Sequence, residues 1–212
     1  MKHEGIKNIV FDFDGTIADT NKGIVKTVQA MLDIIGAPQT SPEDISKAIG
    51  LPLRESLRAG GHLPEELLDE AVRVYREQFD LIAYEHVRLF DGVREGLEGF
   101  FSEGITMGIA TSRSQRSLKM LLKQFGLGEY FSCLATVESV TRHKPEPDTV
   151  LYVLGSLSLK ASETLVVGDT TYDIIMGRGA GCRTCAVTYG NHDKAMLSTA
   201  CPDLIVDSFL EI

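Results

Sequence analysis

The hydrophobic positions of the chain form short runs rich in β-branched residues, separated by longer segments with a helical repeat. The strongest runs, which we expect to be strands, cover residues 8–13, 106–112, 134–137, 164–168 and 184–189, and a weaker one covers 204–207. These runs are almost continuously apolar instead of alternating with polar residues. That pattern is typical of parallel strands buried on both faces of a sheet.

Between these runs lie segments whose apolar residues recur with the spacing of one helix face. They cover residues 93–101, 117–125, 149–157, 173–180 and 192–199. Alternation of strands and helices predicts right-handed crossovers between parallel strands. The sequence therefore predicts an α/β fold with a doubly wound parallel sheet.

One interval interrupts this alternation. The stretch from Asp19 to Thr106 is much longer than the dozen or so residues that a crossover requires. Within it, two apolar stripes have helical spacing, formed by Ile24, Val28, Met31, Leu32 and Ile35, and by Leu68, Ala71, Val72, Tyr75, Phe79 and Ile82. We expect a small all-helical insertion at residues 19–87, with the core formed by residues 1–18 and 88–212.

Composition and charge limit the classes of function. The 212 residues are 43% hydrophobic and 24% charged, as in ordinary folded proteins, and their net charge is −9. An acidic chain repels nucleic acid and anionic lipid, so neither is expected as a partner. If the substrate is an anion, a metal ion or a few placed Lys and Arg side chains must supply local positive charge.

The chain also lacks the sequence features of membrane or secreted proteins. Its longest stretch without a charged residue, 149–159, is well short of the ~20 apolar residues of a membrane-spanning helix. The N-terminal residues show no secretory signal, so a cytoplasmic location is expected. The four cysteines, Cys133, Cys182, Cys185 and Cys201, are expected to be reduced thiols, because no second Cys/His pair has zinc-ligand spacing.

Candidate chemistry begins at the end of the first strand. Asp12 and Asp14 lie where open α/β sheets bind ligands, and two buried carboxylates this close repel unless a cation or a shared proton offsets them. Gly15 lets backbone N–H groups turn toward an anion, and Thr16 adds a hydroxyl. This segment is therefore a candidate anion and metal site.

A second acidic pair, Asp169 and Asp173, follows the strand at 164–168. Oxygen-only ligation by one or two carboxylates together with substrate phosphate suits Mg²⁺. Thr111 and Ser112 end another strand, and Lys144 precedes a helix, where its charge could neutralise a phosphoryl oxygen. The sequence thus predicts a magnesium site beside a phosphate-binding site.

Four segments in this order resemble the motifs of the haloacid dehalogenase-like hydrolase superfamily. They are Asp12-Phe13-Asp14-Gly15-Thr16-Ile17-Ala18-Asp19, Ala110-Thr111-Ser112, Lys144-Pro145-Glu146-Pro147-Asp148, and Gly168-Asp169-Thr170-Thr171-Tyr172-Asp173. The resemblance implies a Rossmann-like catalytic core, and it implies that the helical insertion is a small cap. It points to the subgroup that contains phosphoglycolate phosphatases, pyrophosphatases and β-phosphoglucomutases.

The resemblance also implies residue roles. Asp12 would attack phosphorus and form an aspartyl-phosphate, and Asp14 would act as general acid and then as general base. We expect their environments to separate the two pKa values, with Asp12 ionised and Asp14 protonated. Thr111 and Lys144 would bind the transferring phosphoryl group, with Gly15, Thr16 and Ser112 assisting. Mg²⁺ would be held by Asp12, the carbonyl of Asp14 and Asp169, with Asp173 acting through water or behind the ligands.

Some positions are less informative. Gly50-Leu51-Pro52-Leu53-Arg54 resembles the specificity loop of this subgroup, and Arg54 would either face an anionic leaving group or be a surface charge. Asp91 stands where relatives usually have Pro at the return to the core. Arg113 and His143 depart from the usual motif residues, and we expect both to be solvated. His62, His86 and His192 receive no role.

These features favour a Mg²⁺-dependent phosphatase acting on a small phosphorylated metabolite, similar to phosphoglycolate phosphatase. An inorganic pyrophosphatase and a β-phosphoglucomutase-type mutase use the same motifs and stay open as alternatives. Asp14 argues against a dehalogenase, which has no use for a general acid there. A binding module without catalysis is disfavoured, since binding alone does not require Asp12 and Asp14 together. We expect a monomer, although a homodimer is not excluded by the sequence.

Overall fold

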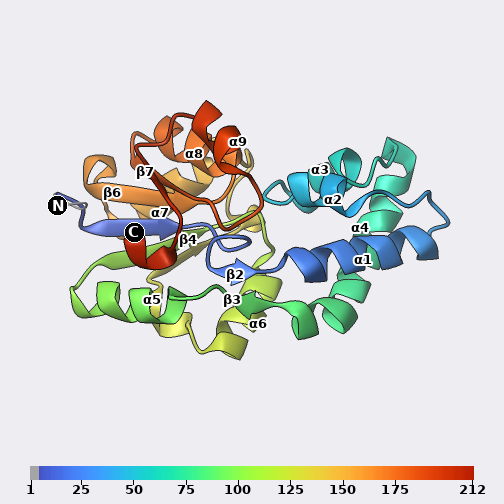
Figure 1. Cartoon of the computed structure of the whole chain (residues 1–212), viewed down its shortest axis with the longest axis horizontal. Coiled ribbons are helices and arrows are strands. Elements are labelled where there is room, and N and C mark those ends of the chain that lie inside the picture. The colour runs from blue at the N-terminus through green and yellow to red at the C-terminus, as the bar shows by residue number, and fades with distance from the viewer. Residues whose placement is uncertain (1–4) are drawn as a thin grey trace.

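The computed structural model describes residues 5–212 and shows a six-stranded parallel sheet with helices on both faces (Figure 1). The strand order is β5-β4-β1-β6-β7-β8, with every neighbouring pair parallel. The strands are β1 (Asn8–Phe11), β4 (Thr106–Ala110), β5 (Cys133–Ala135), β6 (Thr164–Gly168), β7 (Arg183–Val187) and β8 (Leu204–Val206). The predicted doubly wound α/β fold is confirmed.

Four predicted strands extend two residues too far at their carboxyl ends. The runs at 8–13, 106–112, 134–137 and 184–189 continue beyond the ends of β1, β4, β5 and β7 at Phe11, Ala110, Ala135 and Val187. Beyond β1 and β4 the chain leaves the sheet and carries Asp12 and Thr111. The loop residues stay wholly or partly buried, so their pattern resembles that of the strands.

The helices of the sheet lie in two layers, as Figure 1 shows. They are α5 (Val93–Ser102), α6 (Gln115–Phe125), α7 (Asp148–Leu157), α8 (Thr171–Gly179) and α9 (Lys194–Thr199), with 3₁₀ turns η2 (Gly128–Tyr130), η3 (Val137–Ser139), η4 (Ala161–Glu163) and η5 (Phe209–Glu211). Strand β1 contributes to both layers, because Phe11 packs in one hydrophobic cluster and Val10 in the other. The first cluster includes residues of α5 and α6, and the second includes residues of α7 and α8.

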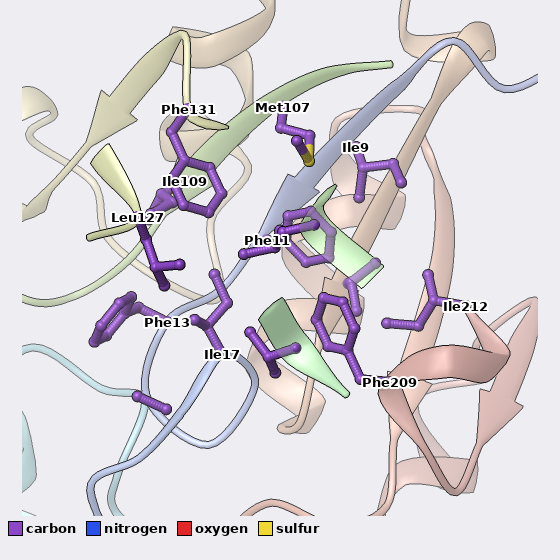
Figure 2. Close-up of a cluster of buried hydrophobic side chains, with 14 of the residues drawn as sticks. Ile9, Phe11, Phe13, Ile17, Met107, Ile109, Leu127, Phe131, Phe209 and Ile212 are labelled. Carbon is purple, nitrogen blue, oxygen red and sulfur yellow. The ribbon is translucent and has the colours of Figure 1, made fainter. Parts of the chain in front are cut away.

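The first of these clusters is centred on aromatic rings (Figure 2). Phe11 stacks on Phe209 with ring centroids 5.6 Å apart and meets Phe131 edge to face at 6.4 Å. Phe209 belongs to η5 near the end of the chain and is 1% exposed. The C-terminal turn is therefore part of the core that supports β1, the strand leading to Asp12.

A helical unit of residues 21–86 lies at one end of the sheet (Figure 1). It contains α1 (Asn21–Ile34), α2 (Pro42–Lys47), α3 (Leu53–Ala59), α4 (Glu65–Ile82) and η1 (Ala83–His86). The two predicted apolar stripes supply residues of α1 and α4 to a separate hydrophobic cluster. The antiparallel ribbon β2 (Ala18–Asp19) and β3 (Arg88–Leu89) connects this unit to the sheet.

Within the described residues, no helix has the length and apolarity needed to cross a membrane. The expectation that the N-terminus carries no secretory signal concerns mainly residues 1–4, which lie outside the described part of the chain. None of the four cysteines is in a disulfide in the described part of the chain, as predicted.

The aromatic cluster generates a stability prediction. Phe209→Ala should lower the free energy of unfolding by about 3–5 kcal/mol, because it opens a cavity beside Phe11. Phe101→Ala is the matched control, since Phe101 is 53% exposed and should cost no more than about 1 kcal/mol. Urea unfolding of both variants measures the difference, and equal losses would contradict the assigned role of the C-terminal turn.

Candidate active site

The candidate site lies at the carboxyl ends of the three adjacent strands β4, β1 and β6. Asp12 follows β1, Thr111 follows β4 and Asp169 follows β6. Because β1 lies between β4 and β6, residues far apart in the sequence meet at one edge of the sheet. Lys144, in the loop before α7, and Asp173, in the first turn of α8, reach the same place.

Two buried carboxylates bind the ammonium group of Lys144, and a third lies close to both of them. Lys144 Nζ donates to Asp12 Oδ1 at 2.5 Å and to Asp173 Oδ1 at 2.6 Å, and all these side chains are at most 2% exposed. One carboxylate oxygen from each of Asp12, Asp169 and Asp173 lies within 4.8 Å of the others. We call Asp12, Asp169 and Asp173 the acidic triad.

Uncharged groups donate hydrogen bonds to two carboxylates of the triad, those of Asp169 and Asp173. The N–H and hydroxyl of Thr170 donate to Asp173 Oδ2 at 3.0 and 2.7 Å. Thr16 Oγ1 donates to Asp169 Oδ1 at 3.0 Å, and the backbone and side-chain amides of Asn191 donate to Asp169 Oδ2 at 2.7 and 2.8 Å. These bonds fix the carboxylates in place without neutralising their charge.

The electrostatic consequence is visible in the pKa values. Burial, together with repulsion between the carboxylates, raises the pKa of Asp12 and of Asp169, although Lys144 opposes this effect at Asp12. Burial alone would lower the pKa of Lys144, but Asp12 and Asp173 outweigh it and raise that pKa. Lys144 therefore stays charged, while Asp12 and Asp169 resist ionisation because Lys144 alone does not balance the three carboxylates.

A divalent cation fits this arrangement. Three carboxylates against one ammonium leave two uncompensated negative charges, and Asp12 Oδ2 is buried without a hydrogen-bond partner. Three glycines leave room beside the triad, since a Cβ at Gly15, Gly168 or Gly190 would lie 2.1–2.3 Å from an atom of Asp169 or Asp173. The triad could therefore hold a metal ion, with oxygen ligands of the kind that Mg²⁺ prefers.

The side chain of Asp14 takes a different direction from the triad. It accepts hydrogen bonds from Arg113 Nε at 3.0 Å, from Arg113 Nη2, and from Thr20 Oγ1 at 2.7 Å. Burial raises the pKa of Asp14, but the charge and hydrogen bonds of Arg113 outweigh burial and leave the pKa below its usual value. The pKa values of Asp12 and Asp14 are therefore separated, but in the opposite direction from the one expected.

The reason is Arg113, which was expected to be solvated and is not. Its side chain is only 7% exposed, and it forms an ion pair with Asp14. His143, the other residue expected to be solvated, is half-buried and lines the cavity described next. The expectation for Arg113 was wrong, because Arg113 is buried against Asp14 and the helical unit, whereas that for His143 stays a prediction.

A cavity of about 710 Å³ separates the sheet edge from the helical unit. The core contributes Asp12, Asp14, Thr111 and Ser112 to its wall, and the helical unit contributes apolar residues of α4 and the segment 49–54. Ser112 Oγ donates to the carbonyl of Gly50 at 2.6 Å and so links the two sides. The cavity is the place where a substrate can reach Asp12.

The other predicted site residues lie in several places. Arg54 lines the cavity, but its guanidinium pairs with Glu65 at 2.6 Å and with Asp69. Thr16 is fully buried against Asp169, and neither it nor Gly15 is among the described residues that line the cavity. Asp12 lines the cavity, whereas Lys144, Asp169 and Asp173 are buried and are not among its lining residues.

Three residues that were not predicted from the sequence form hydrogen bonds to site residues or to their neighbours. Thr20 holds Asp14, Asn191 holds Asp169, and His192 Nδ1 accepts a hydrogen bond from the N–H of Thr171 at 3.1 Å. His192 is 1% exposed and its Nε2 lies 3.4 Å from the carbonyl of Lys47 in the helical unit. Thr20 directly follows the first motif, which was a usable signal, whereas no local pattern marks Asn191 or His192.

Comparison with known proteins agrees with this geometry. Residues 9–187 match a family described as haloacid dehalogenase-like hydrolase. The chain is 36% identical over 210 residues to the probable phosphatase IndB of Dickeya dadantii (strain 3937), covering 96% of this chain and 90% of that protein. It is 34% identical over 211 residues to the putative pyrophosphatase PpaX of Clostridium perfringens (strain 13 / Type A), covering 98% and 95%.

A solved structure described as a predicted phosphoglycolate phosphatase from Haemophilus somnus 129PT superposes with a TM-score of 0.86. It shares 25% sequence identity, and the alignment covers 98% of this chain and 96% of that one. The match therefore includes the helical unit as well as the sheet. The chain belongs to the haloacid dehalogenase-like hydrolase family and is a phosphatase of that family.

Proposed function

We propose that this protein is a Mg²⁺-dependent phosphatase that hydrolyses a small phosphorylated metabolite through an aspartyl-phosphate on Asp12. The observation that carries the proposal is Asp12 itself. It lines the cavity, one of its oxygens is held by Lys144, and the other is buried without a partner. A carboxylate held in this way at a cavity wall is suited to attack an electrophile.

In the proposed reaction, an oxygen of Asp12 forms a bond to phosphorus as the bond from phosphorus to the ester oxygen breaks. Lys144 offsets the charge on Asp12, and Thr111, which is 2% exposed at the end of β4, supplies a hydroxyl for the phosphoryl oxygens. Asp14, which must be protonated at this step although Arg113 favours its ionised form, gives a proton to the departing oxygen. It then accepts a proton from the water that cleaves the aspartyl-phosphate, so that Asp12 is regenerated.

The acidic triad, together with the backbone carbonyl of Asp14, would hold Mg²⁺. When bound, the ion would supply positive charge for the phosphoryl oxygens and lower the pKa of Asp12. Asp173 accepts three hydrogen bonds, from Lys144 and from the N–H and hydroxyl of Thr170, so we assign it a supporting position behind Asp12 and Asp169.

We propose a phosphoglycolate-like monoester as the substrate, because the cavity extends well beyond the space of one phosphoryl group and Arg54 lies in its wall. Pyrophosphate is the second candidate, favoured by the pyrophosphatase named among the relatives. A phosphomutase would require the phosphoryl group of Asp12 to return to a sugar. We further propose that residues 19–87 act as a cap, that the protein is a monomer and that it is cytoplasmic.

The nucleophile can be tested directly. Asp12→Asn should lower phosphate release from the preferred member of a panel of phosphorylated metabolites by roughly 10⁴-fold or more, as expected when a covalent nucleophile is lost. Asp91→Asn is the control, since Asp91 is exposed and lies outside the site. Retained phosphate release in Asp12→Asn would remove the aspartyl-phosphate mechanism. Conversion of glucose 1-phosphate to its 6-phosphate isomer would favour the mutase.

The metal site predicts a pH-dependent stability. Since the folded-state pKa of Asp169 is raised to about 7, the folded protein holds protons that the unfolded chain has lost above about pH 4. Stability measured with a chelator should therefore fall as pH rises from 4 to 7. Mg²⁺ binds the ionised carboxylates, so its stabilisation should grow over the same range, to about 2.7 kcal/mol at a concentration of 100 Kd.

Thermal unfolding at pH 5 and pH 7.5, with Mg²⁺ and with chelator, measures this effect. Asp169→Asn is the matched variant, in which both the pH dependence and the Mg²⁺ shift should shrink. An equal Mg²⁺ shift at the two pH values in the unmodified protein would contradict the proposed ligands.

A further inference from the structure

Arg113 is a buried charged residue of the cavity wall. It follows Thr111 and Ser112 after β4, and its guanidinium makes contacts on three sides. Nε and Nη2 both donate to the carboxylate of Asp14, and Nη1 donates to Ser117 Oγ on α6 at 2.7 Å. This two-pronged pairing gives the ion pair a defined geometry that a lysine could not reproduce.

The Asp14 carboxylate is held from both directions as a result. Oδ2 accepts from Arg113 Nε at 3.0 Å, while Oδ1 accepts from Arg113 Nη2 and from Thr20 Oγ1 at 2.7 Å. Thr20 is fully buried at the start of α1. Because each oxygen has a donor, these two residues determine the orientation of the carboxylate.

The same guanidinium contacts the helical unit. Its central carbon lies 4.8 Å from the ring centroid of Phe79 on α4 and 5.9 Å from that of Phe13 in the core. Phe79 is 4% exposed and belongs to the hydrophobic cluster of the helical unit. A cation over an aromatic face is attracted to it, more strongly where water is excluded. Arg113 therefore joins Asp14 to α4.

We propose that Arg113 is a positioning residue, which fixes the Asp14 carboxylate at the cavity wall and couples its position to α4 through Phe79. This inference rests on the proposed function, in which Asp14 transfers the protons. Arg113 itself acts through Asp14 and not on the phosphoryl group.

A neighbouring arginine provides a matched control. Arg116 also lines the cavity and pairs with the helical unit, through Asp80 at 2.7 Å, but its side chain is 71% exposed and its ion pair does not involve Asp12 or Asp14. Arg113→Met and Arg116→Met each remove one arginine and its ion pair. Arg116 lies in the first turn of α6, and Arg113 lies two residues before that helix. The two variants differ in whether Asp14 loses its partner.

Steady-state phosphate release separates the two variants. Arg113→Met should lower kcat by about 10²-fold with KM changed by less than about threefold, since small misplacement of a catalytic group has effects of this size. Arg113→Lys should recover little of the loss, because an ammonium cannot form the same pairing. Arg116→Met should change kcat by less than about threefold, because Asp14 keeps its partner. A rise in KM with unchanged kcat in Arg113→Met would instead make Arg113 a substrate-binding group and overturn the proposal.

A double-variant cycle tests whether Arg113 acts through Asp14. In an Asp14→Asn background, Arg113→Met should lower kcat by less than about twofold further, because the group that it positions is already disabled. Phe79→Leu removes the aromatic face while keeping an apolar side chain. It should lower kcat several-fold in the unmodified protein but leave kcat of Arg113→Met unchanged. Independent, multiplicative losses in either pair would overturn the proposal.

Unfolding measurements make the test independent of activity. The midpoint shifts caused by Arg113→Met and Asp14→Asn should be non-additive, as expected for a buried pair in contact, whereas those of Arg116→Met and Asp14→Asn should add. If the unmodified protein releases no phosphate from any compound of the panel, the proposed function fails. The unfolding midpoints still decide in that case whether Arg113 holds Asp14. Additive shifts for the first pair would overturn the link.

Discussion

Burial of the acidic triad around Lys144 is the constraint on which the rest of the site depends. Removing several like charges from water is costly, and one ammonium group balances only part of the triad. The structure offsets some of this cost with donors that carry no charge, including Thr16, Thr170 and Asn191. Part of the negative charge of the three carboxylates stays uncompensated. Apolar residues filling the same space would avoid this cost, so stability alone does not explain why the carboxylates are there.

The parallel sheet makes this concentration possible. Lys144 and Asp12 are 132 positions apart in the sequence, yet the strand order β5-β4-β1 brings the segments that follow β5 and β1 to one edge. The aromatic cluster beneath β1 then acts as the rigid support, with Phe209 from the last turn of the chain stacked on Phe11. Asp12 leaves the sheet directly after Phe11 while its N–H still donates to the carbonyl of Val167 at 2.8 Å. Asp12, the proposed nucleophile, is thus fixed by a backbone bond as well as by Lys144.

The sequence predicted the sheet and the acidic residues because both depend on local patterns. Continuous apolar runs identify buried parallel strands, and acidic residues directly after such strands identify a ligand site. Arg113 was misjudged because its environment depends on α4, which lies more than thirty positions away and covers it with Phe79. The reversed order of the two pKa values follows from this burial of Arg113 beside Asp14, because Arg113 lowers the pKa of Asp14 while burial raises that of Asp12. Asn191 was missed for a similar reason, since only the tertiary fold brings its amide to Asp169.

The contacts between the helical unit and the core are concentrated on the loops that carry the site. Ser112 binds the carbonyl of Gly50, Asn21 binds Asn191, and Arg113 lies against Phe79. Each core residue in these pairs is adjacent to, or directly bonded to, Thr111, Asp169 or Asp14. The position of the helical unit and the geometry of the site are therefore not independent. Selection of a leaving group by the helical unit and protonation of that group by Asp14 would consequently be linked through the same few side chains.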